Sequence, residues 1–263
     1  MLINTVILFV KDVLPVFIML SFISMFHIPQ LMTRRDVILL LLLTLAGMWL
    51  LNSHIESLSE LFDGGGLELL YTVIDVAVYF ALLMSCIIFI SAKPINIVQK
   101  LILIVSIAGY IAINLSEFFL YFSTFLVSSQ TLVSTLVGAS FGLGICVSFT
   151  ALFALTLNSL RRNRPIVLLL VWALYLAGFL AQTLYQLQQI DVLNSGRVLW
   201  NSSQWVADSS EYGYLLKAMF GYVSTPTTEY AVVYLLSLIL FAAVIVLPRK
   251  LSRAKLNPMG GLQ

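Results

Sequence analysis

The chain has 263 residues, of which 60% are hydrophobic and only 10% are charged, and its mean hydropathy is +1.02. A soluble domain of this size could not bury so much apolar surface, so the composition excludes a soluble globular fold. The net charge of +2 gives no support to nucleic-acid binding. We therefore expect an integral membrane protein whose main partner is the lipid bilayer.

Apolar runs long enough to cross a membrane recur along the chain. A helical span needs about 20 mostly apolar residues, and a helix satisfies its own backbone hydrogen bonds in lipid. The predicted spans are residues 2–26, 37–53, 69–92, 98–125, 131–158, 165–189 and 229–247. The sequence therefore predicts an all-α bundle of about seven transmembrane helices that forms a single membrane domain over residues 1–263.

Basic residues collect after alternate spans, as short cytoplasmic loops require. These residues are Arg34, Arg35, Lys93, Lys100, Arg161, Arg162, Arg164, Arg249, Lys250, Arg253 and Lys255. Their positions predict that the N-terminus lies outside and the C-terminus in the cytoplasm. Short loops and the absence of a targeting extension favour a bacterial inner (cytoplasmic) membrane.

The longest connection, residues 190–228, is polar and rich in aromatic residues. A connection of this length is either functional or poorly ordered. Its aromatic residues suit the membrane interface and favour an ordered lid on the outer side. We expect part of this lid to be helical around residues 209–220.

Three acids, Asp12, Asp75 and Glu117, lie deep inside predicted spans. A charge in the bilayer costs about 3 kcal/mol or more, so such an acid is either functional or paired with a neighbour that holds helices together, and we weigh the two evenly. Glu68 precedes Asp75 on one face of the third span, together with Thr72 and Tyr79. Carboxylates and hydroxyls are hard ligands that suit Fe, Mn, Mg or Ca.

Asp12 and Glu117 also occupy similar depths of the first and fourth spans. This similarity suggests inverted three-helix repeats followed by a seventh helix, an arrangement that places solute sites near the membrane midplane. Lys11 precedes Asp12 directly, but adjacent residues of an α-helix point in different directions. We therefore expect that Lys11 need not pair with Asp12 and could instead reach Asp75 or Glu117, where it would oppose cation passage.

Residues from the sixth span to the last carry a family resemblance. They read LAQTLYQLQQIDVLNSGRVLWNSSQWVADSS and then YLLKAMFGYVSTPTTEYAVVYLLSLIL, with an LW pair and an FGY…P…Y pattern. Together with the Gly-rich fifth span and the LRRNRP turn, this stretch resembles the oxidase-dependent, high-affinity iron permease family. Members of that family have seven spans with the N-terminus outside. The resemblance implies iron transport without a resident cofactor, and a periplasmic metal-binding or oxidase partner or a membrane subunit.

The family signature is R-E-x-x-E in spans one and four, which supplies carboxylates for iron. The matching stretches here read KDVLP from Lys11 and SEFFL from Ser116, so each keeps the first acid and lacks the second acid and the arginine. The resemblance carries over only Asp12 and Glu117, together with Glu68 where the family has an acid entering span three. Fewer carboxylates weaken a site for a trivalent ion.

We therefore expect a permease for iron or another hard metal cation, with Asp12, Glu117, Glu68 and Asp75 as its metal-binding residues. The alternative is a transport-inactive relative that docks a periplasmic or membrane partner through residues 190–228. We do not expect an enzyme, because the sequence shows no nucleophile with a base and no metal-ligand set with an open position.

Overall fold

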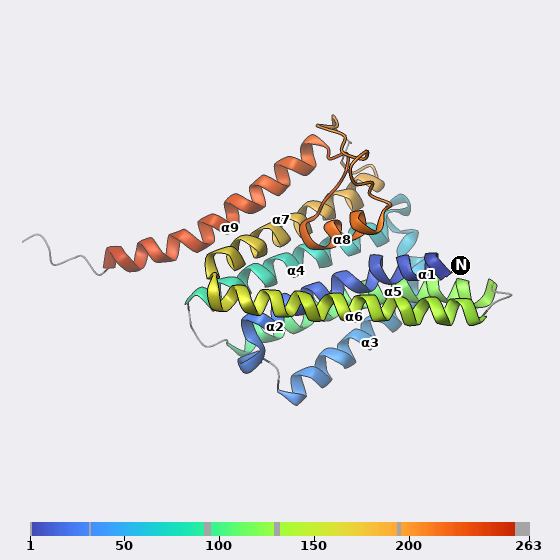
Figure 1. The fold of residues 1–263 in the computed structure, drawn as a ribbon, viewed down its shortest axis with the longest axis horizontal. Coiled ribbons are helices and arrows are strands. Elements are labelled where there is room, and N and C mark those ends of the chain that lie inside the picture. The colour runs from blue at the N-terminus through green and yellow to red at the C-terminus, as the bar shows by residue number, and fades with distance from the viewer. Residues whose placement is uncertain (1, 32, 92–95, 129–131, 194–195, 256–263) are drawn as a thin grey trace, which may run out of the picture.

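The structure is a bundle of long helices joined mostly by short connections (Figure 1). A computed structural model describes residues 2–31, 33–91, 96–128, 132–193 and 196–255. Within these ranges, seven helices are long and apolar enough to cross a membrane. The prediction of a helical membrane protein is therefore confirmed.

The first span is continuous but changes its helical type part-way along. It consists of α1 (Leu2–Leu8), a π-helical segment η1 (Phe9–Val13) and α2 (Leu14–Leu31). The other long helices are α3 (Arg34–Ser59), α4 (Gly66–Ser91), α5 (Ile97–Ser128), α6 (Leu132–Asn163), α7 (Pro165–Gln189) and α9 (Thr228–Lys255). The short elements are a 3-10 turn η2 (Leu61–Gly64) and the helix α8 (Glu211–Phe220).

Several helices are longer than their predicted spans, and α3 and α6 show why. Helix α3 begins at Arg34 because Thr33 and Asp36 form a capping box that satisfies the first backbone donors. Helix α6 continues to Asn163, and its last turn carries Arg161 and Arg162. These cations interact favourably with the negative end of the helix dipole. Capping and end charges therefore extend both helices beyond their apolar stretches.

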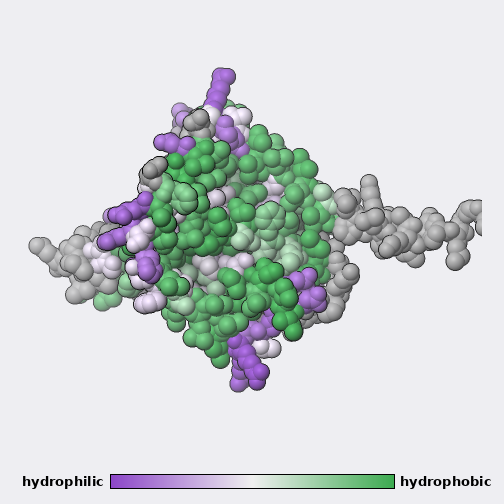
Figure 2. All heavy atoms as spheres, turned by 180° about the vertical axis from the view of Figure 1, so that it is seen from behind, coloured by the Kyte–Doolittle hydropathy of each residue, from purple (hydrophilic) through white to green (hydrophobic). Residues whose placement is uncertain are grey.

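The helices divide into an inner and a peripheral group. Helix α7 packs between α4 and α9, α5 packs against α3 and α4, and α6 lies along α1 and α2. Large side chains such as Phe22, Tyr79 and Trp172 fill the core between them. Only 17–22% of the apolar windows of α3, α6 and α9 is buried. Figure 2 shows one face of the molecule, whose middle is covered mostly by apolar residues, as suits contact with lipid.

Helix α8 lies within the bundle, beside α7 and the first span (Figure 1). Its C-terminal residues Phe220 and Gly221 contact Gly178, which lies near the middle of α7. The prediction of a short helix around residues 209–220 agrees with α8. The sequence does not predict that this helix enters the bundle to about half the depth of α7.

The segment around α8 is ordered by polar contacts of its own. Asp208 accepts hydrogen bonds from the backbone N–H of Ser224 at 2.8 Å and from its hydroxyl at 2.7 Å. The Tyr222 hydroxyl lies 2.8 Å from that of Ser202 and donates to the carbonyl of Val206 at 2.9 Å. Irregular backbone is tolerated within a membrane protein where protein groups satisfy it in this way.

Candidate solute-binding cavity

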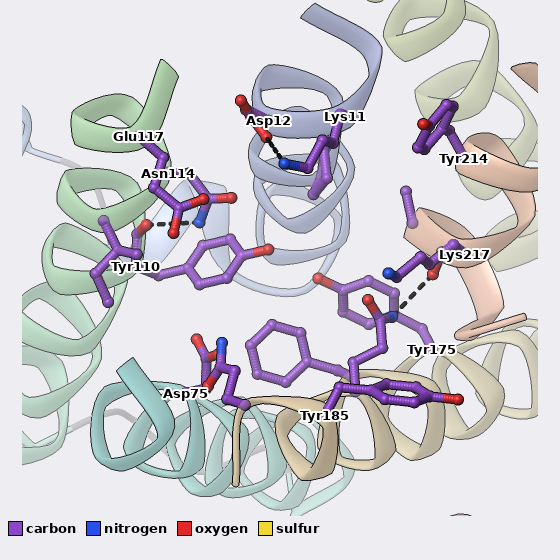
Figure 3. Close-up of a pocket in the computed structure, with 16 residues that line it drawn as sticks. Lys11, Asp12, Asp75, Tyr110, Asn114, Glu117, Tyr175, Tyr185, Tyr214 and Lys217 are labelled. Carbon is purple, nitrogen blue, oxygen red and sulfur yellow. Dashed lines mark hydrogen bonds and ion pairs between the residues drawn. The ribbon is translucent and has the colours of Figure 1, made fainter. Parts of the chain in front are cut away.

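A cavity of about 320 Å³ lies between η1, α4, α5, α7 and α8. It is at the small end of the range for small-molecule sites. Its lining includes three acids, two lysines and four tyrosines (Figure 3). Ionisable groups in the interior of a membrane protein are costly, so their concentration around one cavity marks a functional candidate.

The three deep acids predicted from the sequence share this cavity although they come from different spans. Asp12 is supplied by η1, Asp75 by α4 and Glu117 by α5. Glu68 does not line the cavity, and its Oε2 atom is buried without a hydrogen-bond partner. In the described part of the chain, no three His, Cys, Asp or Glu residues are grouped closely enough to hold a metal ion. The acids therefore share a cavity without forming a compact coordination site.

The π-helical segment η1 positions Lys11 and Asp12. Segments of π-helix are rare and occur often at functional sites. Lys11 Nζ lies 3.8 Å from Asp12 Oδ1 and 5.5 Å from the centre of the Tyr121 ring. Asp12 is only 3% exposed, and its second oxygen, Oδ2, has no hydrogen-bond partner. One oxygen of this buried carboxylate is thus left without a donor.

The expectation that Lys11 need not pair with Asp12 left open a pairing that the structure shows. It assumed the angle between neighbouring side chains in an α-helix, whereas η1 closes its hydrogen bonds to the fifth residue along the chain. The wider turn reduces the angle between successive side chains, so both residues reach the cavity. The pair leaves Lys11 about half exposed, with a side-chain exposure of 49%.

Asp75 is held by a hydrogen-bonded chain between α4 and α7. Gln186 Nε2 donates to Asp75 Oδ2 at 3.1 Å, and Gln186 Oε1 accepts from the Thr72 hydroxyl at 3.1 Å. Tyr79, by contrast, forms a 2.8 Å hydrogen bond with Ser237 of α9 and does not line the cavity. The polar stripe along α4 therefore serves packing as well as the cavity, and only Asp75 of that stripe lines it.

Buried aromatic residues form another part of the cavity wall. The hydroxyls of Tyr110 and Tyr175 point into the cavity between its two sides (Figure 3). The ring of Phe179 lies 5.3 Å from that of Tyr110 and 6.2 Å from that of Tyr175, measured between ring centres. Sequence reasoning missed these residues because tyrosines are common in apolar helices. Tyr175, Phe179, Gln182 and Gln186 recur at helical spacing along α7, which is the signal that could have found this face.

Lys217 is a second basic residue that sequence reasoning missed. It lies on α8, and its side chain is directed into the cavity (Figure 3). Gln182 Nε2 donates to the Lys217 carbonyl at 2.9 Å, which ties α8 to α7 at this residue. Lys217 is accessible through the cavity, yet the surrounding protein displaces much of its hydration and lowers its pKa, an effect that Asp208 partly opposes.

No known protein family, curated protein or solved structure matches the chain. The resemblance to iron permeases therefore stays a prediction. A function has to be argued from the cavity and its residues rather than from relatives.

Proposed function

We propose that this chain is a permease that binds a positively charged solute in the cavity. The observation that carries the proposal is the convergence of Asp12, Asp75 and Glu117, from three separate spans, on one cavity of about 320 Å³. With all side chains ionised, three acids and two lysines give the lining a net charge of −1. Such a lining favours a solute that brings positive charge.

Iron or another hard metal cation is the first candidate solute, because carboxylate oxygens suit such ions. The cavity volume of about 320 Å³ is roughly ten times the 30 Å³ that one water molecule occupies in the liquid. An ion would therefore keep part of its water shell while the acids supply negative charge. Glu68, nearly two turns nearer the start of α4 than Asp75, would extend the path outward.

The proposed permease has its N-terminus outside and its C-terminus in the cytoplasm of a bacterial cell. The cavity would then load from the outer side. Asp12 and Glu117 would occupy equivalent positions of inverted three-helix repeats, followed by a seventh helix. Transporters built in this way usually bind their solute near the membrane midplane, between the repeats.

Uptake of radioactive iron into proteoliposomes that contain only the purified chain tests this proposal. We expect Asp12→Asn and Glu117→Gln to lower the uptake rate by about tenfold or more, because each removes a charge that compensates the cation. Asp36→Asn is the matched control, since Asp36 pairs with Lys100 at the other end of the bundle. Equal uptake by wild type and both cavity variants, with unchanged melting temperatures, contradicts the proposal.

A second candidate function is a transport-inactive subunit that docks a partner protein. It is favoured by exposed aromatic residues in α8 and the segment before it, since Trp200, Trp205 and Tyr212 lie at the surface and Trp205 is 89% exposed. Exposed aromatic groups of this kind are typical anchors of protein interfaces. Absence of uptake, together with a partner from native membranes that no longer copurifies with a well-folded Trp205→Ala variant, would favour this function.

A further inference from the structure

Lys217 faces the acids across the cavity. In Figure 3, Asp75 and Glu117 lie on one side, Lys217 lies on the other, and the hydroxyls of Tyr110 and Tyr175 point into the space between. We propose that Lys217 forms an anion-binding subsite, so that the transported solute carries a carboxylate as well as a positive charge. This inference rests on the proposed function, because it adds a second subsite to the same cavity.

The ammonium of Lys217 forms no ion pair with a described side chain, and Asp208, whose charge acts on it, is itself hydrogen-bonded to Ser224. The ion pairs there join Lys11 to Asp12 and Lys100 to Asp36, and neither involves Lys217. Helix α8 presents this lysine to the cavity while Gln182 holds the backbone of the same residue at 2.9 Å. The surrounding protein removes water from this ammonium and so lowers the pKa of Lys217, and the charge of Asp208 opposes this only in part.

The opposite side of the cavity carries the carboxylates of Asp75 and Glu117. Glu117 makes no hydrogen bond or ion pair with another described side chain, and the one hydrogen-bond donor to the Asp75 carboxylate is the Gln186 amide, at 3.1 Å. The charges of the cavity are therefore separated, with acids that Lys11 neutralises only in part at one side and Lys217 at the other.

A bare cation in this cavity would be attracted by the acids and repelled by Lys217. Like charges at a binding site are costly, and a charge that has lost part of its hydration is stabilised by a group of opposite sign. A solute that carries both charges satisfies both sides at once. Two sources share this chemistry, namely a small zwitterionic amino acid and a metal ion carried by a carboxylate ligand.

Binding to the purified full-length protein in detergent, measured by isothermal titration calorimetry, tests the inference. The zwitterionic probes are glycine, β-alanine and 4-aminobutyrate, and each is paired with the amine that lacks its carboxylate, namely methylamine, ethylamine and propylamine. Ferrous citrate paired with ferrous ion alone tests the metal-borne source. We expect at least one carboxylate-bearing probe to bind about tenfold or more tightly than its counterpart.

Variants of Lys217 then identify the subsite. We expect Lys217→Gln to remove the preference for the carboxylate and Lys217→Arg to retain it. Lys100→Gln, which removes a lysine at the other end of the bundle, is the control and should leave the preference unchanged. Which pair shows the preference distinguishes an amino acid from a metal carboxylate.

The outcomes separate this inference from the proposed function. Binding of ferrous ion or an amine that requires Asp75 and Glu117 supports the permease. A preference for the carboxylate-bearing probe that survives Lys217→Gln overturns the anion subsite. A wild type in which no carboxylate-bearing probe binds better than its counterpart overturns the subsite as well. Absence of both iron uptake and binding of every probe overturns both.

Discussion

Gly178 and Gly221 meet backbone to backbone where the end of α8 reaches the middle of α7. A side chain at Gly178 would overlap the carbonyl group of Phe220, and one at Gly221 would overlap the Gly178 backbone. Gly221 also adopts a left-handed conformation with φ of 67° that ends α8, as is common for glycine. This contact fixes the depth of α8 and therefore the position of Lys217 in the cavity.

The contact predicts a specific response to Gly178→Ala. The added methyl group would push the end of α8 away from α7, which should lower the free energy of unfolding by about 1–3 kcal/mol and weaken solute binding at Lys217. Gly144→Ala is the matched control, because nothing lies within 4 Å of the position its methyl group would occupy. Thermal unfolding in detergent measures both, and equal melting temperatures would contradict the assigned role of this contact.

The long helices were predictable because each is an apolar stretch of sufficient length, and lipid requires such a stretch to be helical. The bounds differ where polar groups extend a helix, as at Thr33 and Arg162. The position of α8 was not predictable from hydropathy. Its ten residues are too few to span a membrane, and the polar residues on both sides of it resemble those of a surface loop.

The candidate site was predictable only in part. Asp12, Asp75 and Glu117 are conspicuous because an acid in an apolar helix is costly, and all three line the cavity. Lys217 was missed since it belongs to the segment expected outside the bundle. The pairing of Lys11 with Asp12 depends on the π-helical turn of η1, which no residue pattern in the sequence indicates.

Gln186 should control the affinity of the site through Asp75. Gln186→Leu removes the donor that holds Asp75 Oδ2 at 3.1 Å. A hydrogen bond to a charged group contributes about 1.5–3 kcal/mol, so we expect the dissociation constant of a bound cation to rise about tenfold or more. Calorimetry with wild type and Gln186→Leu measures the change. The control is Gln99→Leu, which changes a glutamine in the first turn of α5 that does not line the cavity. An equal affinity in wild type and Gln186→Leu would show that Asp75 does not contribute to binding.

Asp208 should stabilise the segment that follows α8, because it binds Ser224 in that segment. Asp208→Ala removes the acceptor of two hydrogen bonds from Ser224, at 2.8 and 2.7 Å. We expect the free energy of unfolding to fall by about 1–3 kcal/mol, since both donors lose a charged partner. The matched control is Ser209→Ala at the exposed neighbouring position. Thermal unfolding checks the prediction, and a loss of stability as large in Ser209→Ala would show that the hydrogen bonds are not its cause.

Lys11 should compete with a positively charged solute for Asp12. Its ammonium lies 3.8 Å from Asp12 Oδ1 but is about half exposed, so water screens the pair. An ion pair of this kind contributes about 0.4–1 kcal/mol, and we expect Lys11→Gln to lower the dissociation constant of ferrous ion or an amine about two- to fivefold. Lys11→Arg should resemble the wild type. Weaker binding of a carboxylate-bearing probe by Lys11→Gln would instead assign Lys11, together with Lys217, to the recognition of the anionic group.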